Sequence, residues 1–207
     1  MDERDQQQKK KTVKLGTRSP HAGYFMPMLE SFAARDDLNE VVKSRVVKSC
    51  DLLDAGVPLF PNDFRKQNDI APVVAAHEGM SAETLGECSE KVALAGRIVS
   101  SRSFGKVAFF HLMDQSGSIQ CYAAKEHLGD EAYAVFKKFD IGDIVGVVGS
   151  LFRTKTGELT VSCESVRLLS RSMRPLPEKY HGLKDMETRY RQRYVDLIVT
   201  PRAREIF

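Results

Sequence analysis

From residue 91 onward, apolar and polar residues alternate along the chain, which is the pattern of strands that are buried on one face only. Stretches rich in Gly, Asp, Ser and Thr interrupt the alternation at residues 114–117 and 154–157, where they favour tight turns. Helical spacing returns over residues 126–138. The pattern therefore predicts five strands, at residues 91–102, 106–113, 118–124, 144–153 and 158–168.

Three strands, one helix and two further strands follow one another in this order within residues 91–168. That order is typical of the OB-fold, a small Greek-key barrel. The predicted helix carries apolar side chains that are available to close one end of such a barrel: Leu128, Tyr133, Val135 and Phe136. We therefore predict a mainly β chain with flanking helices, built around a five-stranded OB-fold barrel at residues 91–171.

Other segments flank the predicted barrel. Residues 1–36 open with a polar tract of glutamines and lysines, which favours disorder. Residues 37–90 are expected to form a helical extension, with an amphipathic helix over residues 37–56 and a short helix after Ser81. Asp36 or Asp37 caps the longer helix, and its apolar side consists of Leu38, Val41, Val42, Val46, Cys50 and Leu53. Residues 172–207 hold a proline-containing linker and a charged helix over residues 184–198.

Composition narrows the class of protein. The net charge is only +3, so nucleic-acid binding depends on a local basic surface rather than on the total charge. The four cysteines form no C-x-x-C pair and the five histidines have no zinc-ligand spacing, so we expect no metal site. No apolar stretch approaches the ~20 residues of a membrane span, and the N-terminus lacks the features of a signal peptide. We therefore expect a cytoplasmic protein that has no membrane partner.

Side chains on a strand point alternately to its two faces, which separates an inner from an outer set in the second, third and fifth strands. The inner set is apolar and consists of Ala108, Phe110, Leu112, Ile119, Cys121, Ala123, Leu159, Val161 and Cys163. The outer set consists of Val107, Phe109, His111, Ser118, Gln120, Tyr122, Glu158, Thr160 and Ser162. Aromatic rings, an amide and a carboxylate are therefore expected on one outer surface.

Phe109 is informative because an exposed phenylalanine leaves apolar area in water. Such rings stack on bases in OB-folds that bind oligonucleotides, at roughly 1–3 kcal/mol per base. Gln120 offers a donor and an acceptor to a base edge. The alternation of side chains also allows Phe109 to pack beneath the N-terminal helix. The candidate phosphate contacts are basic: Arg102, Lys106, Lys43, Arg45 and Lys48.

Residues 174–197 read RPLPEKYHGLKDMETRYRQRYVDL. This stretch closely resembles the linker and following helix of bacterial-type lysyl-tRNA synthetases, which are class II enzymes of the aspartate, asparagine and lysine subgroup. Shorter segments of the barrel and the run GVPLFPNDFR at residues 56–65 also resemble this family, so the resemblance covers residues 38–207. Residues 181–183 and 189–194 resemble the lysyl type, whereas the aspartyl and asparaginyl relatives share the barrel and a related helix rich in arginine and tyrosine.

The resemblance implies that this region binds the anticodon of a lysine tRNA, whose central base is uracil. Phe109 matches the aromatic residue on which the family stacks that base, and Gln120 matches the amide that reads its edge. Arg102 matches the arginine at the end of the first strand. Glu158 matches a glutamate that contacts a neighbouring anticodon base.

The family's enzymes use ATP and Mg²⁺ to activate lysine in a catalytic domain, and they dimerise largely through that domain. No catalytic motif lies within residues 1–207, so we expect the chain to bind tRNA as a monomer without catalysing the ligase reaction. Two alternatives stay open. One is a general single-stranded nucleic-acid-binding OB protein, which anticodon selectivity would separate from the main prediction. The other is an adaptor that engages partners through Tyr190 and Tyr194.

Overall fold

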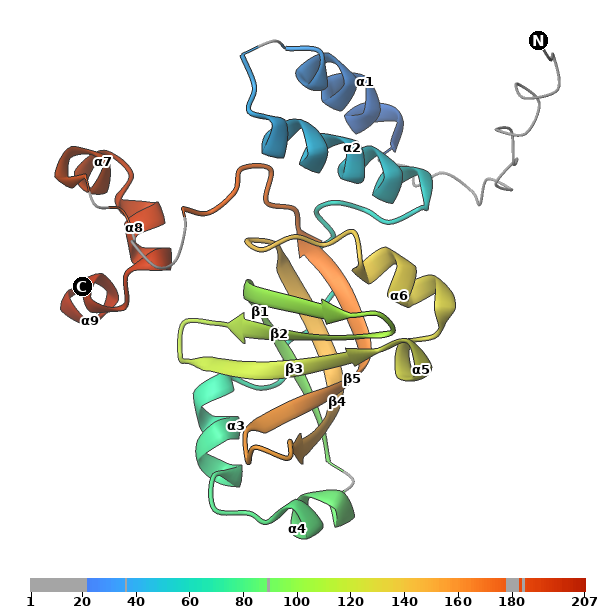
Figure 1. Ribbon diagram of the computed structural model, residues 1–207, viewed down its shortest axis with the longest axis vertical. Coiled ribbons are helices and arrows are strands. Elements are labelled where there is room, and N and C mark those ends of the chain that lie inside the picture. Colours follow the sequence, from blue (N-terminus) through green and yellow to red (C-terminus); the bar gives the residue numbers. More distant parts are fainter. Residues whose placement is uncertain (1–21, 36, 89, 178–182, 184) are drawn as a thin grey trace, which may run out of the picture.

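A closed barrel of five strands forms the centre of the molecule in the computed structural model, which describes residues 22–35, 37–88, 90–177, 183 and 185–207 (Figure 1). The strand order around the barrel is β1-β2-β3-β5-β4, in which β3 and β5 run parallel and the other neighbours antiparallel. The predicted OB-fold is confirmed. The strands are β1 (Lys91–Phe104), β2 (Val107–Met113), β3 (Ser118–Ala124), β4 (Ile144–Arg153) and β5 (Leu159–Ser170).

The helix predicted over residues 126–138 is divided into α5 (Lys125–Leu128) and α6 (Asp130–Phe136). Gly129 separates them because its φ of +82° lies in a region that other residues rarely adopt. Phe136 of α6 is buried, and its ring centroid lies 5.3 Å from that of Phe110 inside the barrel. This helix therefore closes one end of the barrel, as the apolar pattern predicts.

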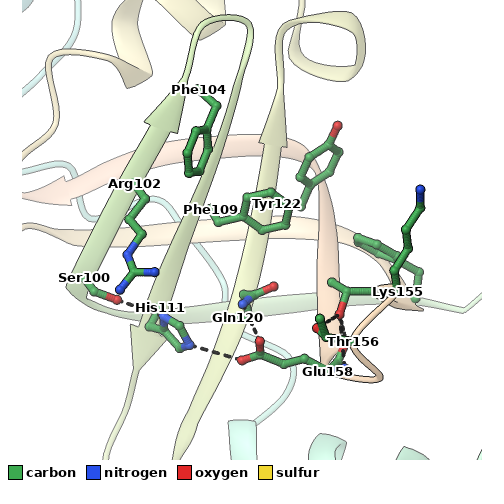
Figure 2. Close-up of a pocket in the computed structure, with 12 residues that line it drawn as sticks. Ser100, Arg102, Phe104, Phe109, His111, Gln120, Tyr122, Lys155, Thr156 and Glu158 are labelled. Carbon is green, nitrogen blue, oxygen red and sulfur yellow. Dashed lines mark hydrogen bonds and ion pairs between the residues drawn. The ribbon is translucent and has the colours of Figure 1, made fainter.

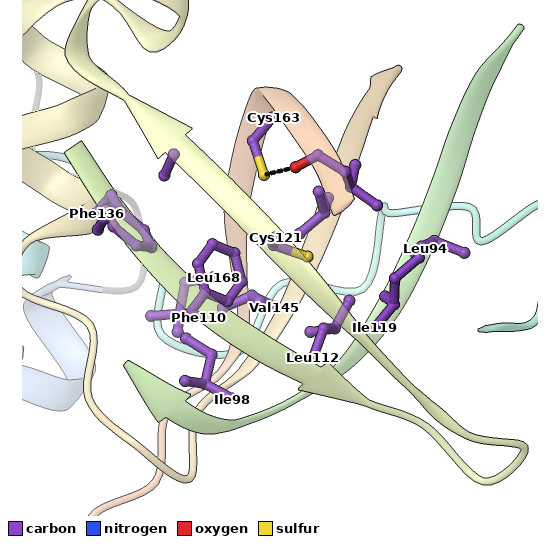
Figure 3. Packing of buried hydrophobic residues seen from close by; sticks show 14 of the residues in the cluster. Leu94, Ile98, Phe110, Leu112, Ile119, Cys121, Phe136, Val145, Cys163 and Leu168 are labelled. Carbon is purple, nitrogen blue, oxygen red and sulfur yellow. Dashed lines mark hydrogen bonds between the residues drawn. The ribbon is translucent and has the colours of Figure 1, made fainter. Parts of the chain in front are cut away.

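The inner faces of the strands pack into one hydrophobic core (Figure 3). Phe110, Leu112 and Cys121, which were assigned to the interior by side-chain alternation, are fully buried. Cys163 is also fully buried, and burial raises the pKa of the neighbouring Cys121 thiol well above its usual value. Both cysteines therefore serve as small apolar core residues. Leu159 differs from the expectation, because it is only partly buried at the start of β5.

A β-bulge at Val99 changes which residues of β1 face outward. Ile98 pairs with the inward-facing Leu112, whereas Ser100 pairs with the outward-facing His111, so the register shifts between them. Regular alternation would place residue 100 on the same face as Ile98. The bulge reverses this, so that Ser100, Arg102 and Phe104 face the outer surface.

In the part of the chain before residue 91 that the structure describes, helices α1 to α4 lie at the two ends of the barrel (Figure 1). Helices α1 (Ala22–Ala33) and α2 (Glu40–Asp54) pack together at one end, and α3 (Ile70–His77) and α4 (Ala82–Glu87) lie at the other. The expectation of a weakly structured segment over residues 1–36 is wrong at α1, because Leu29 of this helix is buried in the core. Residues 1–21 lie outside the described residues.

The start of α2 also differs from the prediction. The N-cap is Asn39, whose Oδ1 accepts a hydrogen bond from the backbone N–H of Val41 at 2.8 Å. Asp37 instead forms an ion pair with Arg35, and Asp36 lies outside the described residues. Val41 is 48% exposed although it belongs to the expected apolar side, because α2 buries a narrower stripe than the sequence pattern indicates.

Arg45 is buried in the structure, which corrects its assignment as a phosphate contact. Its Nη1 donates to the backbone oxygens of Ser172 and Arg174 at 2.8 and 3.1 Å, and its Nη2 donates to that of Ile141 at 2.8 Å. Burial lowers the pKa of the guanidinium, although nearby carboxylates oppose this shift. Arg45 therefore joins α2 to the barrel and to the segment that follows β5.

A buried ion pair lies close to Arg45. Arg171 donates from Nη1 to Asp143 Oδ2 at 2.5 Å and from Nη2 to Asp140 Oδ2 at 2.7 Å. The other oxygen of Asp140 accepts from Lys48 Nζ at 2.7 Å, so this lysine of α2 is also engaged in holding the helix on the barrel. These contacts explain why the basic side of α2 is directed partly toward the protein rather than toward solvent.

Helix α3, which the sequence pattern did not predict, is held at both of its ends by the barrel. Asp114, in the turn between β2 and β3, accepts a hydrogen bond from the backbone N–H of Ile70 at 3.1 Å. Arg153 at the end of β4 donates to the backbone oxygens of His77 and Met80 at 3.0 and 2.8 Å. The predicted cap of the next helix is confirmed, because Ser81 Oγ accepts from the backbone of α4.

Among the described residues after the barrel, the helices are α7 (Met186–Arg191), α8 (Arg193–Val199) and α9 (Pro201–Ile206). The predicted single helix over residues 184–198 is interrupted at Gln192, whose φ and ψ of −117° and 49° are not helical. Buried Asp196 accepts from Arg189 Nε at 3.2 Å and from Arg193 Nη1 at 2.5 Å, so part of the arginine-rich stretch has a structural role. Within the described residues, no helix is both long and apolar enough to span a membrane.

Candidate nucleic-acid interface

The outer faces of β1, β2, β3 and β5 carry side chains in two neighbouring rows. Direct partners across the strands form a polar row, which consists of Ser100, His111, Gln120 and Thr160. The next partners along the same strands form an aromatic row, which consists of Arg102, Phe109, Tyr122 and Ser162. Because residues two apart on a strand share a face, the two rows lie side by side, about 7 Å apart.

A groove of about 740 Å³ runs over these rows (Figure 2). Four residues assigned to anticodon binding line it together: Arg102, Phe109, Gln120 and Glu158. The other lining residues are Ser100, Phe104, His111, Tyr122, Phe152, Thr154, Lys155 and Thr156. The candidate phosphate contacts Lys43, Arg45, Lys48 and Lys106 are not among them. The structure therefore brings together the four candidate anticodon-binding residues and leaves the other candidate phosphate contacts outside the groove.

Phe109 lies in this groove and not beneath the N-terminal helix. Its ring centroid is 5.0 Å from that of Tyr122, its direct partner on β3, with the ring planes tilted by 46°. Tyr122 in turn contacts the rings of Phe152 and His127 edge-on, with centroids 5.9 and 6.1 Å away. These contacts hold the Phe109 ring from one side, while the ring remains only partly buried.

The polar row is joined by hydrogen bonds into a continuous chain that includes Glu158, which lies one residue before β5 (Figure 2). His111 is 2.8 Å from Ser100 Oγ through Nδ1 and 3.2 Å from Glu158 Oε1 through Nε2. Gln120 Nε2 donates to Glu158 Oε2 at 2.6 Å, and Gln120 Oε1 accepts from Thr160 Oγ1 at 3.0 Å. Thr160 is fully buried, although alternation assigned it to the outer face.

Positive charge lies on two sides of the groove. Arg102 extends from β1, and Lys155 lies in the turn between β4 and β5. Both side chains are exposed, and neither forms an ion pair within the part of the chain that the structure describes. The groove therefore combines an aromatic floor, a hydrogen-bonding row and two cations, which are the components of a single-stranded nucleic-acid site.

Sequence reasoning missed several lining residues. Phe104 is 62% exposed and shares the outer face with Arg102, but this becomes visible only once the bulge at Val99 is placed. His111 and Tyr122 were assigned to the outer face without a role. Lys155 belongs to a turn whose direction the residue alternation does not determine.

The resemblance implies Mg²⁺ and ATP for a larger enzyme, so the residues were compared with the needs of a metal. Among the residues placed in the structure, no group of three or more His, Cys, Asp or Glu side chains is arranged to hold a metal ion. Mg²⁺ sites are built from oxygen ligands such as carboxylates. The described residues therefore do not fit a metal centre.

Comparison with known proteins agrees with the fold. Residues 92–169 match the family model of the OB-fold nucleic acid binding domain. The lysine–tRNA ligase of Oceanobacillus iheyensis is 44% identical over 172 residues, which cover 83% of this chain and 35% of that protein. The lysine–tRNA ligase of Bacillus subtilis is 43% identical, with 83% and 34% covered, and that of Magnetococcus marinus is 50% identical, with 84% and 35% covered. The chain thus spans about one third of the length of these relatives.

Proposed function

We propose that this chain, which is related to the lysine–tRNA ligases and carries an OB-fold nucleic acid binding domain at residues 92–169, binds the anticodon loop of a lysine tRNA. One observation carries the proposal. The groove on the outer face of the barrel brings the Phe109 ring, the Gln120 amide and the Arg102 guanidinium together over one aromatic surface.

Each of these groups has a separate task in the proposal. Phe109 stacks on the central base of the anticodon, which gives affinity but little discrimination because every base has a flat face. Gln120, one row away, reads the edge of that base with its amide. Arg102 and Lys155 attract the phosphates on either side, which makes binding weaken as salt rises.

A uracil fits the hydrogen-bonding capacity that Gln120 has left. One amide hydrogen is used by Glu158 and one lone pair of Oε1 is used by Thr160, so one hydrogen and one lone pair remain. Uracil presents an N3–H donor beside a carbonyl acceptor, which can satisfy both. A base whose edge lacks this order leaves polar groups unpaired at a cost of about 1–3 kcal/mol each.

The proposal extends to a role in attaching lysine to tRNA, which is the activity that the names of the lysine–tRNA ligases state. In that role the barrel selects the tRNA, and the reaction with ATP and Mg²⁺ belongs to a larger, homodimeric enzyme. Lys43, Lys48 and Lys106 supply outer phosphate contacts away from the groove. Lys48 is the weakest of these because it is already bound to Asp140.

The competing function is general binding of single strands, which the open aromatic floor of the groove also favours. Fluorescence anisotropy separates the two when the chain is titrated into a labelled lysine anticodon stem-loop at about 0.1 M salt. In separate titrations, the unlabelled stem-loop or an unlabelled single-stranded RNA of the same length and mixed sequence is then added as competitor. We expect the anticodon stem-loop to compete at least tenfold better than mixed-sequence RNA, and equal competition would favour the general binder.

A further inference from the structure

The orientation of the Gln120 amide is fixed by a carboxylate. Gln120 Nε2 donates to Glu158 Oε2 at 2.6 Å, and its Oε1 accepts from Thr160 Oγ1 at 3.0 Å. An ionised carboxylate only accepts hydrogen bonds, whereas a hydroxyl both donates and accepts. Rotating the amide by half a turn would direct Gln120 Oε1 at Glu158, where two acceptors would face each other.

Thr160 does not prevent this rotation by itself. Its Oγ1 is also 3.2 Å from the backbone oxygen of Glu158, so its hydrogen can turn to that acceptor and leave the oxygen free to accept from Gln120. The Glu158 side chain is therefore the group that distinguishes the two orientations of the amide.

Glu158 is itself held in place from two directions. His111 Nε2 lies 3.2 Å from its Oε1, and the other nitrogen of the same ring is 2.8 Å from Ser100 Oγ (Figure 2). The backbone of Glu158 is fixed by the turn that precedes β5, where its N–H donates to Thr154 Oγ1 at 3.1 Å and its carbonyl accepts from the Thr154 N–H at 3.0 Å. The carboxylate is thus directed at Gln120 by both its side chain and its backbone.

We propose that Glu158 is a positioning residue that locks the Gln120 amide in the orientation that accepts uracil and rejects cytosine. This inference rests on the proposed function and adds the source of its selectivity. Uracil and cytosine are similar in shape, but the N3 and C4 positions of uracil are a donor and an acceptor, while those of cytosine are an acceptor and a donor. Half a turn of the glutamine amide converts the partner of one base into the partner of the other.

The test uses Glu158→Gln, which keeps the shape of the side chain but replaces one acceptor oxygen by an amide donor. A glutamine at this position can present either its oxygen or its amide hydrogens, so Gln120 becomes free to turn. The side chain of Glu158 is 46% exposed, and we therefore expect the variant to fold normally. Glu164→Gln is the matched control, because Glu164 lies on β5, six residues after Glu158, but binds Lys91, away from the groove.

Affinities of the wild-type chain and both variants are measured for two anticodon stem-loops that differ only in a central uracil or cytosine. For Glu158→Gln we expect the ratio of the affinities for the uracil and cytosine forms to fall by about tenfold to near one, because the freed Gln120 amide can pair with either base. Glu164→Gln is expected to keep the wild-type preference. Nitrogen-15 NMR of the Gln120 side-chain amide supplies a second readout, since its signals should shift in Glu158→Gln alone.

The possible failures have different meanings. A wild-type chain without a preference contradicts the proposed function, and the role of Glu158 falls with it. If the wild-type chain prefers uracil and Glu158→Gln keeps this preference, only the role of Glu158 in orienting the Gln120 amide is contradicted. If Glu158→Gln lowers the affinities for both forms by the same factor, Glu158 contributes only the contact with a neighbouring base that the resemblance implies, and it does not set the orientation of the Gln120 amide.

Discussion

Phe109 on β2 and Tyr122 on β3 are direct partners across the sheet, and their ring centroids lie 5.0 Å apart on the outer face of the barrel. The Tyr122 ring is enclosed by further aromatic contacts, while Phe109 keeps a face toward the groove. This pairing explains how a phenylalanine can remain partly exposed without losing its orientation. The contact of Phe109 with Tyr122 belongs to the fold, whereas the face of Phe109 that is turned to the groove is available for binding.

Replacement of Phe109 by alanine should weaken binding to the anticodon stem-loop by about 1–3 kcal/mol, which is the stacking contribution of one base. The loss should be similar for uracil and cytosine forms, because stacking does not read the base edge. Isothermal titration calorimetry measures the affinity, and Phe109→Tyr, which keeps the aromatic face, is the control. An affinity that Phe109→Ala does not change would remove the stacking role.

Arg102 should contribute to RNA affinity only through its positive charge. Arg102→Gln is expected to weaken binding to all stem-loops alike and to reduce the slope of log K against log salt by about 0.7, the value for one phosphate of a single strand. Titrations between 0.05 and about 0.3 M salt give this slope. Lys137→Gln, an exposed charge on the helix cap region of α6 and outside the groove, should leave it unchanged. An unaltered slope in Arg102→Gln would show that Arg102 does not contact a phosphate of the bound RNA.

Arg45 should affect stability and not RNA binding. Arg45→Met removes the donor from three backbone oxygens, and a buried acceptor without a partner costs about 1–3 kcal/mol. We therefore expect a clear decrease in the free energy of urea unfolding, with stem-loop affinity unchanged under conditions where the variant is folded. Lys43→Met on the same helix is the control for loss of charge. Normal stability of Arg45→Met would contradict the structural role.

Asp140 should make the fold sensitive to acid. Burial raises its pKa, but the hydrogen bond from Lys48 and the charge of Arg171 lower it more, so the folded-state pKa lies below the ordinary value of 3.8. Protons then bind the unfolded chain more readily, and the stabilisation present above about pH 4 is lost as the pH falls through the folded-state pKa. When the free energy of unfolding is measured between pH 6 and about 2.5, it should fall less steeply with decreasing pH in Asp140→Asn than in the wild-type chain.

Asp130→Asn, which removes an exposed carboxylate of α6, is the control for this experiment. It should follow the wild-type curve. Parallel curves for Asp140→Asn and wild type would show that the Asp140 contacts do not determine the acid response.

Alternation of side chains predicted most of the barrel because strands buried on one face follow a simple rule. Phe109 and Gln120 were placed on the outer face correctly by this rule. It fails at β1, where the bulge at Val99 reverses the faces and hides the place of Phe104. A bulge depends on the pairing with the neighbouring strand, which the local sequence does not specify.

Two further features could not be predicted from the sequence. The basic residues of α2 were predicted to contact phosphates. Arg45 is instead buried, where it donates hydrogen bonds to backbone carbonyl groups more than ninety residues away in the sequence. The bond between Gln120 and Glu158 joins residues 38 positions apart, across the parallel pairing of β3 and β5. Such contacts follow from the closure of the barrel and not from the spacing of residues.

The most direct test of the account is the affinity of the wild-type chain for a lysine-type anticodon stem-loop, compared with a copy in which the central uracil is replaced by cytosine, at moderate salt. We predict that the uracil form binds about tenfold more tightly, a difference of about 1.4 kcal/mol. Equal affinities would contradict anticodon reading by the groove that Phe109 and Gln120 line.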